Sequence, residues 1–161
     1  MRGGRFGIAA LLVGVLLGWM PGAAWAAGCR ADTVYLKGGW GQVRFKVELA
    51  DSAAERAQGL MNRTALANSA GVLIVYPHPQ AVAFWMRNTL IPLDMLFIDE
   101  AGRVQHIHEN AIPLDETPIP GGDDIRYVLE VNAGVLRQLG LTTGSVMRHP
   151  AVPSNLAVWP C

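Results

Sequence analysis

The sequence is poor in charge, in cysteine and in known catalytic motifs. Charged side chains make up 16% of its 161 residues, against about 25% in typical soluble domains, and 13 basic residues are balanced by 13 acidic ones. Because phosphate contacts need a surplus of Lys and Arg, this balance excludes a nucleic-acid binder that acts through bulk charge. The hydrophobic content of 51% excludes a disordered chain. The length suits one domain and leaves little room for a second.

Motifs that would identify an enzyme or a metal protein are also missing. The sequence contains no Gly-x-Ser-x-Gly elbow, no phosphate-binding loop and no His-Glu-x-x-His zinc motif. His106 and His108 lie two residues apart in an expected strand, which is a spacing that can hold a transition metal. Two ligands do not make a site, and a polar strand face is the alternative interpretation. We therefore predict no cofactor, no metal ligand and no catalytic residue.

The N-terminus is typical of a secretory signal. Arg2 and Arg5 precede an apolar run over residues 6–20, which is shorter than the about 20 residues needed to span a bilayer. A small-x-small pattern at residues 24–26 follows, so we expect cleavage after Ala26. This predicts an exported, periplasmic protein with one domain over residues 27–161 and no stable membrane span. An uncleaved anchor is the alternative.

The only two cysteines are Cys29 and Cys161. In an exported protein an even pair predicts a disulfide, which here would join the two ends of the mature chain. The alternative is a loose lipobox at residues 26–29, with a lipid on Cys29 as a membrane anchor. That reading would leave Cys161 as an unpaired thiol in an oxidising compartment.

Apolar periodicity predicts many strands and few helices. Alternation marks half-buried strands over residues 34–36 and 42–49, and Ser52 to Glu55 fits a capping box for a short helix that ends near Gly59. The remaining expected elements are strands at 71–76, 81–86, 93–99, 104–108, 125–131 and 145–149, a loop at 110–124, and a second short helix capped by Asn132 and ending at Gly140. The expected fold is α+β, with a β-rich, mostly antiparallel curled sheet or half-barrel and two short helices.

Three segments carry a family resemblance. They are ERAQGLMNR at residues 55–63, FWMRNTLIPLDMLFID at 84–99 and VLEVNAG at 128–134. Together they resemble the domain-of-unknown-function 192 (DUF192) family, also called uncharacterised protein family 0127, over about residues 33–149. The resemblance implies a compact, often exported α+β domain. The family has no established activity, so the resemblance assigns no catalytic residue.

Asp94 is the residue that most needs an explanation. In its expected strand it shares a face with Leu96 and Ile98, and a carboxylate there is costly unless it is paired or hydrogen-bonded. It would serve either as a polar latch that fixes the bend before it or as the floor of a ligand pocket. The candidate partners are Arg56, Arg63, Arg87, Asn88 and Thr89.

These observations favour a non-enzymatic ligand-binding or accessory domain. Its ligand would be a small polar molecule or an envelope component, bound between the end of the first helix and the bend before Asp94. The predicted binding residues are Arg56, Met61, Arg63, Trp85, Arg87, Asn88, Thr89 and Asp94. The alternatives are an envelope hydrolase that uses Asp94 as acid or base and a protein that binds metal through His and Met.

Overall fold

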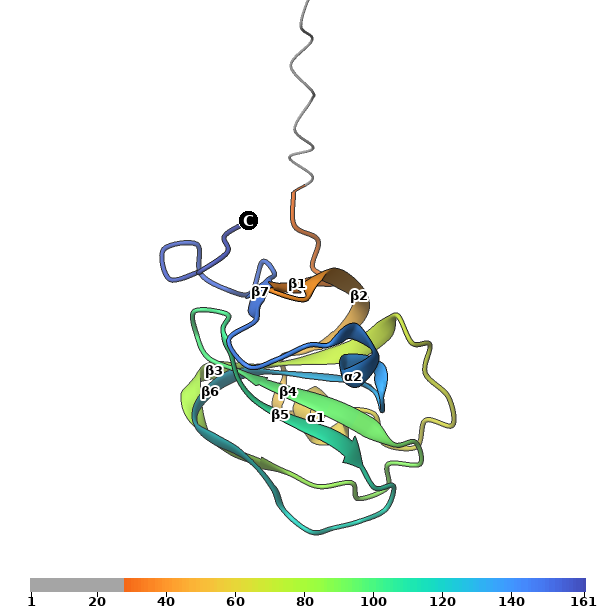
Figure 1. The fold of residues 1–161 in the computed structure, drawn as a ribbon. Helices are drawn as coiled ribbons and strands as arrows, with labels where there is room; N and C mark the ends of the chain where they lie inside the picture. Colours follow the sequence, from red (N-terminus) through yellow and green to blue (C-terminus); the bar gives the residue numbers. More distant parts are fainter. Residues whose placement is uncertain (1–27) are drawn as a thin grey trace, which may run out of the picture.

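The computed structural model describes residues 28–161, and the signal expected over residues 1–26 lies outside them (Figure 1). The elements run in the order β1 (Thr33–Gly38), β2 (Gly41–Ala50), α1 (Ala53–Gln58), β3 (Ala70–Phe84), β4 (Leu93–Ile98), β5 (Val104–Ala111), β6 (Ile119–Asn132), α2 (Val135–Leu139) and β7 (Val146–Arg148). Strands dominate and both helices are short, which confirms the α+β class. No helix in this described part is long and apolar enough to cross a bilayer.

The seven strands form one curled sheet in the order β5-β4-β6-β3-β2-β1-β7. Only β2 and β3 pair in parallel, and the other neighbours are antiparallel. The sheet curls until its two edges meet at one end, where Arg103 bridges to Val146 and the Val104 amide donates to the Ser145 carbonyl at 2.8 Å. The result is the expected half-barrel.

Both faces of the central strands are buried, so the protein has two cores. In β4, Leu96 and Ile98 point into the curl of the sheet, whereas Met95 and Phe97 point to its outer side. Leu136 of α2 packs into the inner core, and Leu60, just after α1, packs into the outer one. This confirms that the apolar strands need cover on both sides.

The strand boundaries differ from the expected ones in two places. β3 continues through Pro77-His78-Pro79, where the sequence predicted a stop. The pairing of β3 with β6 is irregular between Val75 and Gln80, so prolines without an N–H remove no regular ladder bond there. Similarly, β5 and β6 extend into the loop expected over 110–124, and only residues 112–118 remain between them.

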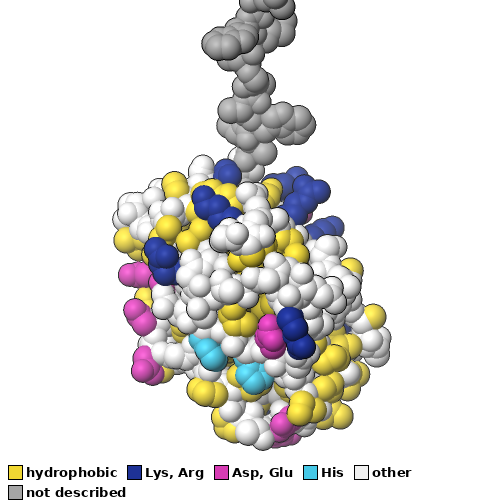
Figure 2. Space-filling view, in the orientation of Figure 1, with side chains coloured by type: hydrophobic (Ala, Val, Ile, Leu, Met, Phe, Trp, Pro, Cys, Tyr) yellow, Lys and Arg dark blue, Asp and Glu magenta, His cyan; other side chains and the backbone are white. Residues whose placement is uncertain are grey.

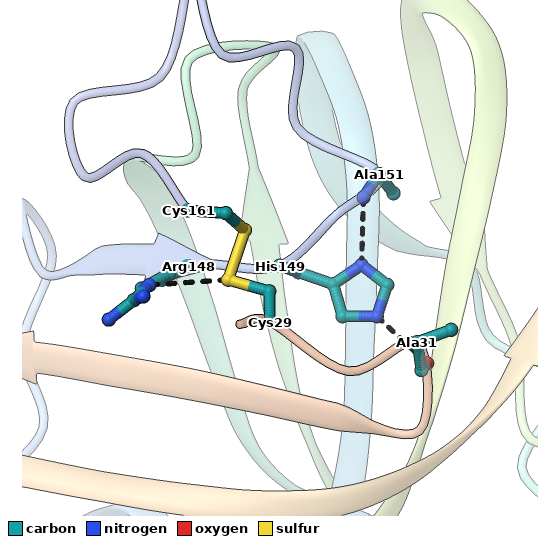
Figure 3. Close-up of a disulfide and its surroundings, with 6 residues drawn as sticks. All are labelled: Cys29, Ala31, Arg148, His149, Ala151 and Cys161. Atoms are coloured by element: carbon teal, nitrogen blue, oxygen red, sulfur yellow. Dashed lines mark hydrogen bonds between the residues drawn. A yellow bond between two sulfur atoms is a disulfide. The ribbon is translucent and has the colours of Figure 1, made fainter. Parts of the chain in front are cut away.

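The expected disulfide joins Cys29 to Cys161, with 5.6 Å between the two Cα atoms (Figure 3). Nearby, the Arg148 Nε donates to the Cys29 Sγ at 3.2 Å. His149 is buried between Ala31 and Ala151, with hydrogen bonds to the carbonyl of one and the amide of the other. The bond occupies the Cys29 sulfur that a lipid thioether would require, so the pairing disfavours the lipobox interpretation.

Candidate functional site

Asp94 is fully buried, and backbone amides satisfy both of its carboxylate oxygens. Its Oδ1 accepts from the Asn110 amide at 2.9 Å, and its Oδ2 accepts from the Leu136 amide at 3.1 Å. Leu136 lies in the first turn of α2, whose N-cap residue Gly134 provides no side-chain acceptor. Asp94 therefore does for α2 what a capping side chain would do.

This arrangement differs from the one expected for Asp94. Within residues 28–161 it forms no ion pair, and none of the five predicted side-chain partners bonds to it. Because Asp94 shares the inner face of β4 with Leu96, it lies across the sheet from Met86 and Leu60 of the outer core. The structure thus separates Asp94 from the rest of the predicted site, and its two hydrogen bonds tie β4 to β5 and α2 rather than to the bend before Asp94.

A second acid, Glu130 of β6, is buried on the outer face of the same sheet. It pairs in register with Met95 of β4 and Val72 of β3 and is only 5% exposed. Its Oε2 has no hydrogen-bond partner, and the only other such buried side-chain atom in residues 28–161 is the Arg126 Nε. A buried oxygen without a partner is costly, and no donor among residues 28–161 bonds to this one.

Glu130 forms part of the wall of a narrow cleft of about 50 Å³ at the C-terminal end of α1. Four of the predicted site residues line the same cleft, namely Arg56, Met61, Trp85 and Thr89. The other lining residues are Ala57, Gln58, Gly59, Leu60 and Phe84. A volume of this size holds one or two water molecules or the polar end of a ligand, but not a sugar ring.

Local signals in the sequence place α1 over Glu130. The capping box forms as predicted, with the Ser52 Oγ accepting from the Glu55 amide at 3.2 Å and the Glu55 Oε2 accepting from the Ser52 amide at 3.0 Å. Gly59 ends the helix with a φ of 45°, and a methyl group at this residue would lie 3.0 Å from the Glu130 Oε2. Glycine therefore allows both the positive φ at the helix end and the close approach of this end to the Glu130 carboxyl group.

The bend between β3 and β4, which carries Trp85, is connected to the neighbouring turns by backbone hydrogen bonds. The Asn62 amide donates to the Asn88 carbonyl at 2.8 Å, and the Leu114 amide donates to the Thr89 carbonyl at 3.1 Å. Asn62, Asn88 and Leu114 all have positive φ values, which few residues other than glycine adopt. The wall of the cleft is therefore fixed by three interlocked turns.

Burial controls the electrostatics of the cleft. Desolvation raises the pKa of Glu130 from its ordinary 4.5 to about 7, so the carboxyl group gains and loses its proton near neutral pH. Desolvation also raises the pKa of Tyr76, with the positive charge of Arg56 opposing that shift. The Arg56 guanidinium lies 5.5 Å from the Tyr76 ring and donates to the Val75 carbonyl at 3.1 Å. It is held by these contacts and forms no ion pair with Glu130.

The remaining predicted residues lie around the cleft rather than in it. Arg63 forms an ion pair with Glu48 in a second hollow of about 150 Å³, which shares Gln58 and Gly59 with the first. Arg87 is exposed and stacks at 5.6 Å over the Trp85 ring. Asn88 joins the turns through its carbonyl, as described above. The structure thus brings together Arg56, Met61, Trp85 and Thr89, and leaves the other four predicted residues outside the cleft.

The two histidines considered as metal ligands lie on the outer face of β5. His106 stacks on the Phe97 ring at 5.6 Å, and His108 pairs in register with Met95. Among residues 28–161 no three His, Cys, Asp or Glu side chains lie close enough together to hold a metal ion.

Sequence reasoning missed Glu130 although the signal was present. Glu130 follows Val128 and Leu129 and precedes Val131 in an expected strand, which is the same apolar context that drew attention to Asp94. Applied to both acids, that argument predicts two buried carboxyl groups. The structure was needed to show which of them lacks a donor.

The chain is similar to several solved structures, two of which are compared with it below. A protein described as a candidate transcription regulator, from Sinorhizobium meliloti 1021, has 40% sequence identity and a TM-score of 0.70 over 71% of this chain and 90% of that one. A protein of unknown function from Novosphingobium aromaticivorans DSM 12444 has 38% identity and a TM-score of 0.71 over 81% of this chain and 99% of that one. No curated protein matches the chain. The family DUF192, described as "Uncharacterized ACR", matches residues 35–149, and the chain therefore belongs to the DUF192 family.

Proposed function

We propose that the protein is an exported binding domain in which Glu130 accepts a hydrogen bond from an N–H or O–H group of a small polar ligand. One observation carries this proposal: Glu130, only 5% exposed, has a carboxyl oxygen without a partner and forms part of the wall of a cleft open to solvent. A ligand that donates to the Oε2 would remove the cost of that oxygen. The volume of about 50 Å³ limits the buried part of the ligand to a few atoms.

The rim of the cleft suits the rest of such a ligand. Trp85 is 47% exposed and offers an aromatic surface, while Arg87 above its ring and Arg56 in the cleft lining offer positive charge. A ligand with a donor at one end and a planar or anionic part at the other would contact all of these groups. The disulfide supports export, because such bonds persist in oxidising compartments.

Hydrolysis is the weaker alternative. Both oxygens of Asp94 already accept backbone hydrogen bonds, so this residue has no contact with a substrate to protonate or deprotonate. Glu130 has a pKa of about 7, which suits general acid–base catalysis, but the cleft lining contains no second carboxyl group and no histidine. These features favour binding over catalysis.

Titration with small probes tests the proposal. Methylammonium and ethylene glycol carry a charged and a neutral donor, and their binding is followed by NMR at the amides of Gly59 and Thr89. We expect both amides to shift in the wild-type protein, with methylammonium binding more tightly as the pH rises through 7 and Glu130 ionises.

Two variants of Glu130 distinguish binding of the charged donor from binding of the neutral one. Glu130→Gln keeps an acceptor without the charge and should abolish binding of methylammonium only, whereas Glu130→Met removes the acceptor and should abolish binding of both probes. The exposed Glu116→Gln is the matched control and should bind like the wild type. Binding that survives in Glu130→Met, or an absence of shifts with both probes, would contradict the proposal.

A further inference from the structure

The outer side of the β7-β1-β2 edge carries four cationic side chains. Tyr35 pairs in register with Arg148 of β7 on one side and with Arg44 of β2 on the other. Lys37 and Lys46 each lie two residues along from this row and therefore point to the same side of the sheet. We call Lys37, Arg44, Lys46 and Arg148 the basic face. Figure 2 shows Lys and Arg side chains gathered in the upper part of the molecule, with most Asp and Glu below.

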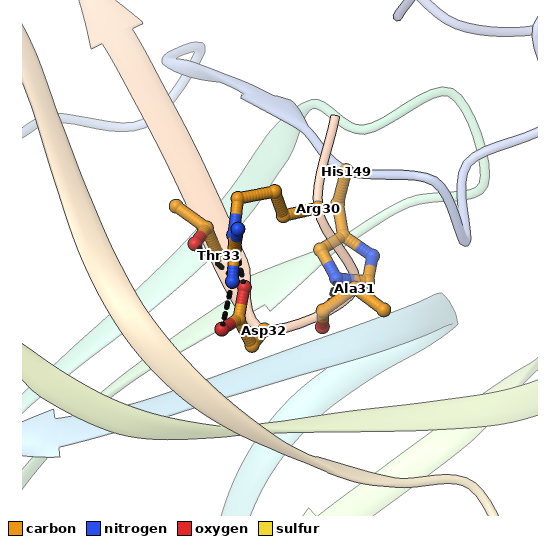
Figure 4. A network of polar contacts seen from close by, with 5 residues as sticks. All are labelled: Arg30, Ala31, Asp32, Thr33 and His149. Carbon is orange, nitrogen blue, oxygen red and sulfur yellow. Dashed lines mark hydrogen bonds and ion pairs between the residues drawn. The ribbon is translucent and has the colours of Figure 1, made fainter. Parts of the chain in front are cut away.

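Acidic side chains do not neutralise this face. In the part of the chain that the structure describes, none of its four cations forms an ion pair. The adjacent Asp32 carboxylate binds Arg30 through two hydrogen bonds of 2.8 and 2.9 Å (Figure 4), which hold its pKa well below the usual range. The positive charge of the basic face is therefore available to a partner.

Aromatic rings lie among these cations. The Lys37 Nζ lies 4.2 Å from the centre of a Trp159 ring, and the Arg148 guanidinium lies 5.6 Å from the same residue and 5.9 Å from the Tyr35 ring. Trp159 lies two residues before Cys161, whose disulfide ties this end of the chain to Cys29, just before β1. Rings with one polar edge, set beside cations, are typical of surfaces that contact the headgroup region of a membrane.

We propose that the basic face docks onto a membrane surface that bears anionic phosphate headgroups. A hollow of about 460 Å³ next to Tyr35 is lined by Thr33, Arg44, Lys46, Ser69 and the Arg30–Asp32 ion pair. The unpaired Arg44 and Lys46 offer charged donors there to a phosphate group. Two further cations of the basic face, Lys37 on β1 and Arg148 on β7, lie outside this hollow, which suits a layer of headgroups better than one small anion. The zero net charge of the whole chain disfavours nucleic acid as the partner.

Vesicle sedimentation tests the proposal with residues 27–161, the mature chain expected after cleavage, which contains both cores and the disulfide but not the apolar run at 6–20. We expect binding to vesicles of equal parts phosphatidylcholine and phosphatidylglycerol, no binding to phosphatidylcholine alone, and release as salt increases. Each Lys or Arg near an anionic leaflet contributes about fivefold to the partition coefficient. Reversal of one charge in Arg44→Glu should therefore weaken binding about tenfold or more, and Lys46→Glu should act alike.

The exposed Arg137→Glu, on α2, changes the net charge equally and is the matched control. It should leave binding within about twofold of the wild type, since it lies outside the basic face. Equal weakening by Arg44→Glu and Arg137→Glu would overturn the proposal, because only net charge would then matter. Binding to phosphatidylcholine alone would also overturn it, as would tighter binding to duplex DNA than to the anionic vesicles.

Discussion

At the scale of single residues, two buried acids on neighbouring strands differ in their hydrogen bonding. Asp94 accepts two backbone amides on the inner face of the sheet, whereas the Glu130 Oε2 has no partner on the outer face. Both lie in apolar surroundings, so burial alone does not distinguish a structural carboxyl group from a functional one. The supply of donors does, because a satisfied acid stabilises the fold and an unsatisfied one can stabilise a complex.

The raised pKa of Glu130 should make stability depend on pH. Its pKa is about 7 in the folded protein and near 4.5 when unfolded, so the native state binds more protons between these values. This contribution is fully present below pH 4.5 and is lost as the pH rises through 7. Glu130→Gln should therefore match the wild type near pH 4.5 and exceed it by up to about 3 kcal/mol at pH 8.

Urea unfolding of both proteins across this pH range measures the effect. The lowered pKa of buried His149 acts in the opposite direction below its unfolded value of 6.5, but it is common to both proteins and cancels in their difference. The exposed Glu116→Gln serves as the control for lost charge. A difference between Glu130→Gln and wild type that does not change with pH would refute the assignment.

The sequence predicted which residues would be buried better than it predicted their partners. Asp94 was expected to bond to side chains such as Arg87, because a sequence shows which side chains could pair but not where backbone amides lie. Its actual donors are the backbone amides of Asn110 and Leu136, and these are positioned by strand pairing and by a helix start more than forty residues away. Four of the eight predicted site residues line the cleft. They come from two short segments, the end of α1 and the bend between β3 and β4, whose local conformations the sequence indicates.

At the scale of elements, the sequence predicted features that depend on neighbouring residues, but not features that depend on residues far away in the chain. The capping box of α1 formed as predicted because all of its groups lie within four residues. The start of α2 was expected to be capped by Asn132, but that side chain bonds instead to the Leu66 carbonyl and to Asn68. Asp94 takes the capping role from another strand. The continuation of β3 through Pro77 likewise depends on its partner β6, which the local sequence does not contain.

If Asp94 anchors α2, its conservative replacement should destabilise the fold. Asp94→Asn keeps the shape but turns one acceptor into an N–H group that faces the amide of Asn110 or Leu136. A buried donor that faces another donor should lower the free energy of unfolding by about 2–4 kcal/mol. Thermal and urea unfolding measure the loss, with the exposed Asp124→Asn as the control.

The same variant distinguishes the two roles considered for Asp94. A structural latch requires the loss of stability together with unchanged probe binding at Glu130 in the fraction that remains folded. Hydrogen exchange should show faster exchange of the Leu136 amide before other amides of the inner core. Unchanged stability with lost probe binding would instead return Asp94 to the ligand site.

At the scale of the whole molecule, the sheet order brings distant segments together and the disulfide closes the arrangement. The β1 strand lies between β2 and β7, so the first and last strands are neighbours, and the Cys29–Cys161 bond lies just beyond them. Cysteine count and the expected export predicted this bond, whereas the order β5-β4-β6-β3-β2-β1-β7 was beyond reach of the sequence. Strand order depends on which apolar faces meet, and many orders satisfy the same alternation.

Loss of the disulfide should destabilise the protein mainly through the unfolded chain. The bond spans 132 residues, and removing so long a cross-link raises the entropy of the unfolded state, which typically costs about 2–4 kcal/mol. Cys29→Ser combined with Cys161→Ser should therefore unfold at lower urea concentration, and its slope against urea should rise because the unfolded chain is less compact. Wild-type protein with reductant should behave like the double variant, and reductant should leave the variant unchanged.

Because Arg148 and Trp159 are held beside this bond, the variant should also bind anionic vesicles less well than Arg137→Glu does. Equal stability of oxidised and reduced protein would show that the strand pairing of β1 with β7 holds the chain ends without the bond.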